Sequence, residues 1–212
     1  MLLTKVDRLI LASQKHWHLD PGDDCYFFGE YTARQRYDFS EVNQFILNFK
    51  KSMDRKCVPL EWRHKETAIW RASEILAEGL ATPNNIEALR AATLVPVPPS
   101  NLPGDPLYDD RILRMLSGLN ARVGGLDIRQ LVTQRYAYPA SHSIESRATP
   151  EQLGANYVID ESLSNPVPRS IWIFDDLLVS GSHYRAMVQT LRLRFTNAAF
   201  VGIFLARRIT IE

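Results

Sequence analysis

The pattern of apolar positions predicts helices and one strand within the first 80 residues of the chain. Apolar residues recur at helical spacing over residues 42–49, directly after Ser40, a residue type favoured at helix N-caps, and again over residues 64–80. Aromatic residues crowd into residues 25–31 after a turn-like stretch, which favours a strand. Residues 1–17 mix apolar and charged positions, and we expect an amphipathic helix there rather than a secretory signal.

Further along, short apolar runs alternate with amphipathic stretches. Strands are predicted at residues 93–98, 127–134, 171–174 and 198–206, and helices carry apolar faces within residues 112–119 and 184–195. This alternation is typical of a parallel sheet whose strands are joined by crossover helices. The periodicity fades between residues 135 and 169, where we expect a long excursion that is partly ordered by a hairpin.

The predicted fold class is therefore α/β, an open and mainly parallel sheet flanked by helices, preceded by a helical and aromatic N-terminal addition. The change of pattern divides the chain into an N-terminal helical region, residues 1–90, and an α/β core, residues 91–212. A chain of 212 residues can bury a sizeable core, so one domain with a small addition is favoured, and two domains remain an alternative.

Composition narrows the class of protein. An apolar fraction of 45% and a charged fraction of 23% are ordinary for a globular protein, and no apolar run approaches bilayer length, so we expect a cytoplasmic protein without a membrane segment. The net charge of +1 gives no global case for nucleic-acid binding. Cys25 and Cys57 lie far apart and are expected to be reduced thiols, while His16 and His18 are expected to be surface histidines rather than metal ligands.

Candidate chemistry appears where an apolar strand ends. Asp175 and Asp176 follow the apolar run at residues 171–174, and ligands of open parallel sheets bind beyond the carboxyl ends of the strands. The next residues offer Gly181 for close backbone approach, Ser180 and Ser182 as hydroxyl donors, and the free N–H groups of a starting helix. A phosphorylated sugar suits both halves, whereas the alternative is that one of the aspartates merely caps the next helix.

The stretch IWIFDDLLVSGSHYRAM, residues 171–187, resembles the phosphoribosyl pyrophosphate signature of type I phosphoribosyltransferases. The resemblance implies that Asp175 and Asp176 contact the ribose hydroxyls, directly or through water bound to Mg²⁺. It also implies a 5′-phosphate loop, which comprises Val179, Ser180, Gly181, Ser182 and His183. Some purine-salvage members carry a catalytic acid at the position of Val179, an option that its apolar side chain removes.

A second segment extends the resemblance. The sequence VPVPPS, residues 95–100, is placed like the pyrophosphate-binding loop of the family, which assigns that ligand to Pro98, Pro99 and Ser100. Arg111 could contact the same pyrophosphate, or it could pair with its neighbouring aspartates at the surface. Arg147 is a candidate lid residue. The overall arrangement looks most like the ComF-like branch, which is associated with DNA uptake, and residues 1–90 would then act as a hood.

Two functions follow from this resemblance. The first is a magnesium-dependent phosphoribosyltransferase that binds phosphoribosyl pyrophosphate and releases pyrophosphate, with Asp175, Asp176 and Arg111 as the reacting-site residues. The second is a non-catalytic sensor or effector of the same fold, which binds a phosphorylated ribose or nucleotide and acts on a protein or nucleic-acid partner in DNA uptake or bacterial defence. The missing basic residue beside Pro98–Pro99–Ser100 favours the second. The acceptor base stays open, and a homo-oligomer stays an alternative to a monomer.

Overall fold

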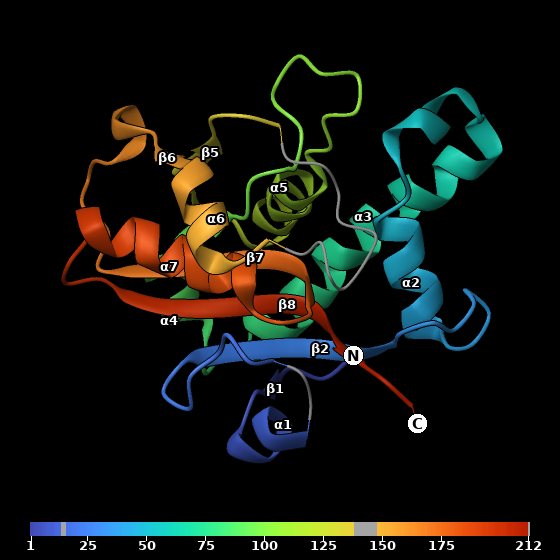
Figure 1. Ribbon diagram of the computed structural model, residues 1–212, viewed down its shortest axis with the longest axis horizontal. Helices are drawn as coiled ribbons and strands as arrows, with labels where there is room; N and C mark the ends of the chain where they lie inside the picture. The colour runs from blue at the N-terminus through green and yellow to red at the C-terminus, as the bar shows by residue number, and fades with distance from the viewer. Residues whose placement is uncertain (14–15, 138–147, 212) are drawn as a thin grey trace.

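The computed structural model describes residues 1–13, 16–137 and 148–211. Its central sheet has six strands in the order β1-β2-β8-β7-β3-β4 (Figure 1). Their bounds are β1 (Thr4–Lys5), β2 (Asp24–Thr32), β8 (Ala199–Ile209), β7 (Ser170–Leu178), β3 (Thr93–Pro96) and β4 (Asp127–Ile128). Every neighbouring pair is parallel except β1 with β2, so the expectation of an open, mainly parallel α/β sheet flanked by helices is confirmed.

Helices cover both faces of this sheet. One apolar cluster joins the sheet to α2 (Glu41–Phe49), α3 (Pro59–Leu80), α4 (Ile86–Ala91) and α5 (Arg111–Val123). A second cluster, on the opposite face, joins it to α1 (Arg8–Ser13), α6 (Pro150–Asn156) and α7 (Ser182–Arg194). Figure 1 shows α6 and α7 together, well separated from the pair α2 and α3. A two-stranded sheet of β5 (Val132–Gln134) and β6 (Tyr157–Ile159) lies beside this second layer. Short 3₁₀ turns span Met53–Cys57 and Glu161–Leu163.

The buried strands explain why both faces need cover. In β7, Ile171 and Ile173 enter the second cluster, whereas Trp172 and Phe174 pack against the first. Side chains along a strand alternate between its two faces, so a continuous apolar run is stable only when helices bury both.

The strand order indicates a candidate ligand-binding crevice between β3 and β7. The chain leaves β3 for β4 on one side of this pair, and it leaves β7 for β8 on the other. In open α/β sheets, ligands bind at such a reversal, outside the carboxyl ends of the strands. β3 ends at Pro96 opposite Phe174, and β7 continues beyond that point to Leu178.

Most predicted elements are confirmed. The predicted strand at residues 25–31 is β2, the helix after Ser40 is α2, and the apolar residues at 184–195 bury one side of α7. Ser40 accepts a hydrogen bond from the N–H of Asn43 at 3.0 Å, as an N-cap should.

Three expectations are wrong in extent or type. Residues 127–134 do not form one strand, because β4 joins the central sheet and β5 pairs with β6 instead. The first residues include the strand β1 before a short α1, rather than one amphipathic helix. The strand predicted at residues 171–174 continues to Leu178, because β8 pairs with it beyond the point at which β3 ends. Within the predicted excursion, residues 135–169, the structure has α6 and β6, and β6 pairs with β5, which precedes the excursion, so this pair is not the predicted hairpin. Residues 138–147 lie outside the description.

Residues 1–90 and 91–212 share one sheet, and both contribute to the apolar clusters on its two faces. β2 pairs in parallel with β8 from Asp24 to Thr32, and Phe49 of α2 shares a buried cluster with Phe174 of β7. In the described part of the chain, no helix is both long and apolar enough to cross a membrane.

Candidate functional site

The two adjacent aspartates lie inside β7 and face opposite sides of the sheet. Asp176 hydrogen-bonds residues at the end of α2 and the start of α5, whereas Asp175 lies among groups of α7 and β6. This corrects the expectation that both follow the strand, and it results from the β8 pairing that extends β7 to Leu178. Neither aspartate caps α7, whose N-cap position is Gly181, so the capping alternative is wrong.

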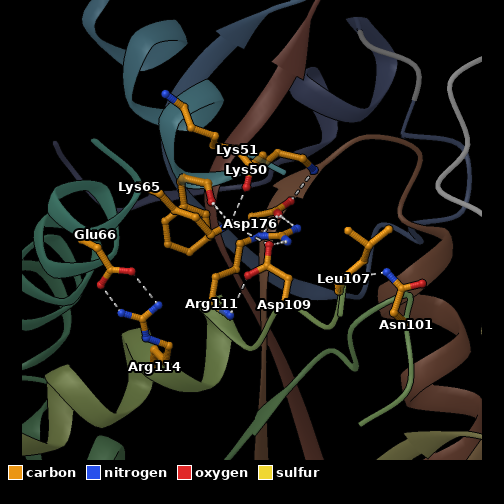
Figure 2. A network of polar contacts seen from close by, with 11 residues as sticks. Lys50, Lys51, Lys65, Glu66, Asn101, Leu107, Asp109, Arg111, Arg114 and Asp176 are labelled. Carbon is orange, nitrogen blue, oxygen red and sulfur yellow. Dashed lines mark hydrogen bonds and ion pairs between the residues drawn. The ribbon is translucent and has the colours of Figure 1, made fainter. Parts of the chain in front are cut away.

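Asp176 is held between two cations (Figure 2). Its Oδ1 accepts from Lys50 Nζ at 2.8 Å, and its Oδ2 accepts from Arg111 Nε at 3.0 Å and from an Arg111 terminal nitrogen at 2.5 Å. The Asp176 side chain is only 4% exposed. Both of its oxygens therefore already have charged partners.

The network continues through a buried lysine. Asp109 Oδ2 accepts from Arg111 at 2.6 Å and from Lys65 Nζ at 2.7 Å. Lys65 is fully buried, and its ammonium also donates to the carbonyl oxygens of Lys51 at 2.7 Å and Phe49 at 3.2 Å. These carbonyls lie at the C-terminal end of α2, where a positive charge is favourable. The cluster thus ties α2, α3, α5 and β7 together, as Figure 2 shows.

The charges in this network set the titration behaviour of its members. Burial alone would raise the pKa of Asp176, but Lys50 and Arg111 outweigh it and lower that pKa. Burial likewise opposes the charge of Arg111, yet the carboxylates of Asp176 and Asp109 raise its pKa. For Lys65 burial is the larger effect and lowers its pKa, although Asp109 partly compensates. Asp176 and Arg111 are therefore both charged at neutral pH.

Asp175 has a different environment. It is half-buried and makes no ion pair with any described residue, and its Oδ1 accepts the backbone N–H of Asp176 at 2.8 Å. Burial and the neighbouring charge of Asp176 raise the pKa of Asp175, while His183 and Lys50 oppose that rise. A carboxylate with a raised pKa and no cation bound to it is a typical candidate for contact with a ligand.

The predicted phosphate loop makes the expected sharp turn, but its hydroxyls point inward. Gly181 adopts the left-handed conformation with φ of +88°, which glycine tolerates best. The Ser180 and Ser182 hydroxyl oxygens lie 2.5 Å apart and bond each other, and the two residues are only 5% and 6% exposed. The hydroxyls are therefore not presented to solvent as phosphate donors.

A segment near the N-terminus covers this loop. The N–H of His18 donates to the carbonyl of Ser180 at 2.9 Å, and a Cβ placed on Gly181 would lie 2.9 Å from two side-chain carbons of Leu19. Leu19 is itself buried. The inner side of the loop is consequently closed by residues 16–19.

The buried position of His16 differs from the prediction for it. His16 is buried and hydrogen-bonds the carbonyl of Val179 through Nδ1, so its expected surface position is wrong. Burial lowers its pKa, and a neutral imidazole results. His183 is exposed, and its Nδ1 lies 3.2 Å from the Tyr157 hydroxyl. Of the predicted loop, His183 is the residue whose side chain reaches solvent most fully.

The remaining predicted residues are spread along the same edge. Pro98 is buried, Ser100 is exposed, and the carbonyl of Pro99 accepts from the Gln134 amide at 2.9 Å. Arg111 pairs with Asp109 and Asp176 in a partly buried position rather than at the surface. The lid candidate Arg147 lies outside the described residues.

Sequence reasoning missed the buried part of the network. Lys65 precedes Ile69, Ala72 and Leu76 at helical spacing, so a lysine on an apolar helix face was the available signal. No comparable signal pointed to Asp109 as its partner, because the two residues are 44 positions apart in the sequence.

The described residues do not form a protein metal centre. Among them no group of three or more His, Cys, Asp or Glu side chains is placed to hold a metal ion. Both Asp176 oxygens are paired with cations, so of these two aspartates only Asp175 has oxygens without a cation partner. The residues present therefore do not fit a direct Mg²⁺ site.

A scan against models of protein families and a search of curated proteins both gave no match for this chain.

Proposed function

We propose that this chain binds a phosphorylated ribose compound, of the phosphoribosyl pyrophosphate or nucleotide class, at the carboxyl ends of β3 and β7. The observation that carries the proposal is Asp175, a half-buried carboxylate without an ion pair in the described structure, located beside the reversal of strand order. A carboxylate that accepts two hydrogen bonds is a suitable partner for adjacent ribose hydroxyls.

The phosphate would lie on the solvent side of the start of α7. The first N–H groups of a helix lack carbonyl partners within it, and the helix dipole favours an anion there. The exposed His183 side chain is at the same end and adds a donor. Ser180 and Ser182 would shape the turn rather than donate to phosphate, since their hydroxyls bond each other. This arrangement modifies the role that the resemblance to type I phosphoribosyltransferases implies for the two serines.

Transfer of the phosphoribosyl group is the second candidate. Loss of pyrophosphate requires positive charge near the leaving group, and the Lys50 ammonium, 40% exposed beside Asp176, can supply it. In such a reaction a nucleophile would form a bond to the anomeric carbon as the bond to pyrophosphate breaks. The protein would contribute positioning and charge stabilisation.

Calorimetric titration with phosphoribosyl pyrophosphate, with and without Mg²⁺, tests the binding. We expect saturable binding that weakens at least tenfold in Asp175→Asn and severalfold in His183→Ala. Asp38→Asn, which alters a carboxylate 57% exposed and remote in sequence, is the matched control and should bind normally. Absence of binding, or equal binding by Asp175→Asn, would contradict the proposal.

Turnover separates the two candidates. Pyrophosphate release would be measured with a panel of purine and pyrimidine bases, at saturating phosphoribosyl pyrophosphate. Release that is lost in Lys50→Met, with binding retained, would establish transfer. Binding without release would assign the protein to the sensor class, which acts through a protein or nucleic-acid partner.

A further inference from the structure

A cavity of about 60 Å³, partly open to solvent, lies beside the end of β3. Its lining comes from residues 96–99 and 101–103 at and after the end of β3, from residues 108, 110, 112 and 113 around the start of α5, and from residues 130 and 132–134 between β4 and the end of β5. Since β3 lies between β7 and β4 in the sheet, this cavity opens on the β4 side of β3, whereas Asp175 belongs to β7.

The walls are apolar and rigid. Four prolines line the cavity, together with aliphatic side chains: Pro96, Pro98, Pro99, Pro103, Val97, Leu102, Ile112, Leu113 and Val132. Proline rings have a fixed backbone angle and few conformations to lose, so they present a preformed surface. Such walls favour a flat apolar ligand over a flexible or strongly hydrated one.

The polar groups of the cavity fall into two sets. Asn101 and Gln134 are already used, since Asn101 donates to the carbonyl of Leu107 at 3.0 Å and Gln134 bonds Pro99 and Asn156. The side chains of Tyr108, Asp110 and Gln130 line the same space and make no hydrogen bond with any described residue. Together with the exposed Thr133, which also lines the cavity, these groups are therefore the ones left to orient a ligand.

Asp110 is the decisive residue among them. It occupies the N-cap position of α5, where an aspartate normally accepts a backbone N–H, yet its side chain makes no capping hydrogen bond. It is also the one charged side chain among the described residues of the lining. The Tyr108 hydroxyl is close enough to feel this charge, because burial and then the Asp110 carboxylate raise the pKa of Tyr108.

We propose that this cavity binds a planar nitrogen heterocycle with adjacent N–H donors, of the aminopurine, aminopyrimidine or pterin class. The donor edge of the ring pairs with the two oxygens of Asp110, and the ring face packs against the proline wall. Two parallel N–H···O bonds to a carboxylate give both strength and orientation. A phosphate does not enter, since the charged group of the lining is an anion.

The test uses 2-aminobenzimidazole, a flat bicycle whose ring N–H and amino group can both donate to one carboxylate. Indole, which has the same shape and a single N–H, is the matched ligand control. Binding is followed by chemical-shift changes in amide spectra of the full chain. We expect 2-aminobenzimidazole to bind at least tenfold more tightly than indole.

Two variants locate the binding. Asp110→Asn should weaken the binding of 2-aminobenzimidazole at least tenfold and leave the binding of indole unchanged. Tyr108→Phe should weaken the binding of 2-aminobenzimidazole severalfold. Asp38→Asn should change neither ligand. Circular dichroism checks that each variant is folded, which is expected because the Asp110 side chain makes no bond in the described structure. The proposal would be overturned by equal affinity for the two ligands, by no binding of either, or by an unchanged affinity of Asp110→Asn for 2-aminobenzimidazole. No phosphorylated compound is present, so the outcome is independent of the phosphoribosyl proposal.

Discussion

The neighbouring carboxylates of β7 should respond in opposite directions to the same substitution. Asp176→Asn removes a charge that is 4% exposed and that pairs with Lys50 and Arg111. Breaking a buried ion pair by removing one partner typically costs about 3–5 kcal/mol. Because Arg111 keeps Asp109 and Lys50 is 40% exposed to water, we expect the lower end of that range, about 3 kcal/mol.

Asp175→Asn should instead stabilise the unliganded protein. Burial and the Asp176 charge raise the pKa of Asp175, and each unit of such a rise is about 1.4 kcal/mol of penalty on the ionised form. An asparagine oxygen can still accept the N–H of Asp176, so the substitution keeps that bond. At pH 7 we expect a gain of about 1 kcal/mol, since a neutral amide avoids the penalty.

Urea unfolding, followed by tryptophan fluorescence, measures both effects. With slopes of about 2–3 kcal/mol per molar for a chain of this size, Asp176→Asn should lower the midpoint by about 1 M. The contributions of Asp175 and Asp176 to stability also change with pH in opposite directions. The raised pKa of Asp175 lowers stability as pH rises through it, so the gain of Asp175→Asn vanishes as pH falls toward 4. The lowered pKa of Asp176 gives stability that is lost only as pH falls below about 4, and the deficit of Asp176→Asn should shrink there.

The exposed Asp38→Asn should stay within about 0.5 kcal/mol of the natural protein. Equal destabilisation by the substitutions at Asp175 and Asp176 would refute their assignment to different environments. A cost below about 1 kcal/mol for Asp176→Asn would refute the buried network, since that is the upper value for an exposed pair.

Three further predictions test other parts of the structure. Lys65→Met should lower the free energy of unfolding in urea by about 3–5 kcal/mol, because Lys65 is fully buried. The control is Lys5→Met: the Lys5 ion pair has a similar distance of 2.6 Å, but its side chain is 55% exposed, so the cost should be at most about 1 kcal/mol. Similar costs for the two substitutions would contradict the burial argument. Gly181→Ala should lower stability by at least about 1 kcal/mol more than Gly104→Ala. Both glycines have positive φ, but only at Gly181 would the added Cβ clash with a side chain, that of Leu19. Thermal unfolding measures the difference, and equal losses for the two variants would show that the loop is not covered. Ser40→Ala should cost about 1 kcal/mol through loss of the N-cap bond, and an unchanged unfolding midpoint would argue against that cap.

Local pattern determined most of the elements of this fold. The apolar runs of β3, β7 and β8 and the helical spacing in α2, α5 and α7 depend on near neighbours in sequence, and each was predictable. The extent of β7 was not, because β8 rather than its own residues decides where pairing stops. The split of residues 127–134 is of the same kind, since the partner of β5 lies in an excursion that carries little periodicity.

The sequence alone placed Asp175, Gly181 and His183 at one edge of a parallel sheet, and it indicated a ligand with an anionic and a hydroxyl-bearing end. Only the tertiary structure decided what each group touches. Asp176 is neutralised by Lys50 and Arg111, which lie 126 and 65 residues away, and the N-terminal segment closes the inner side of the loop. Contacts of that range depend on how the helices pack on the sheet, which no local pattern encodes. The same packing leaves Asp175 without an ion pair in the described chain, unlike the adjacent Asp176.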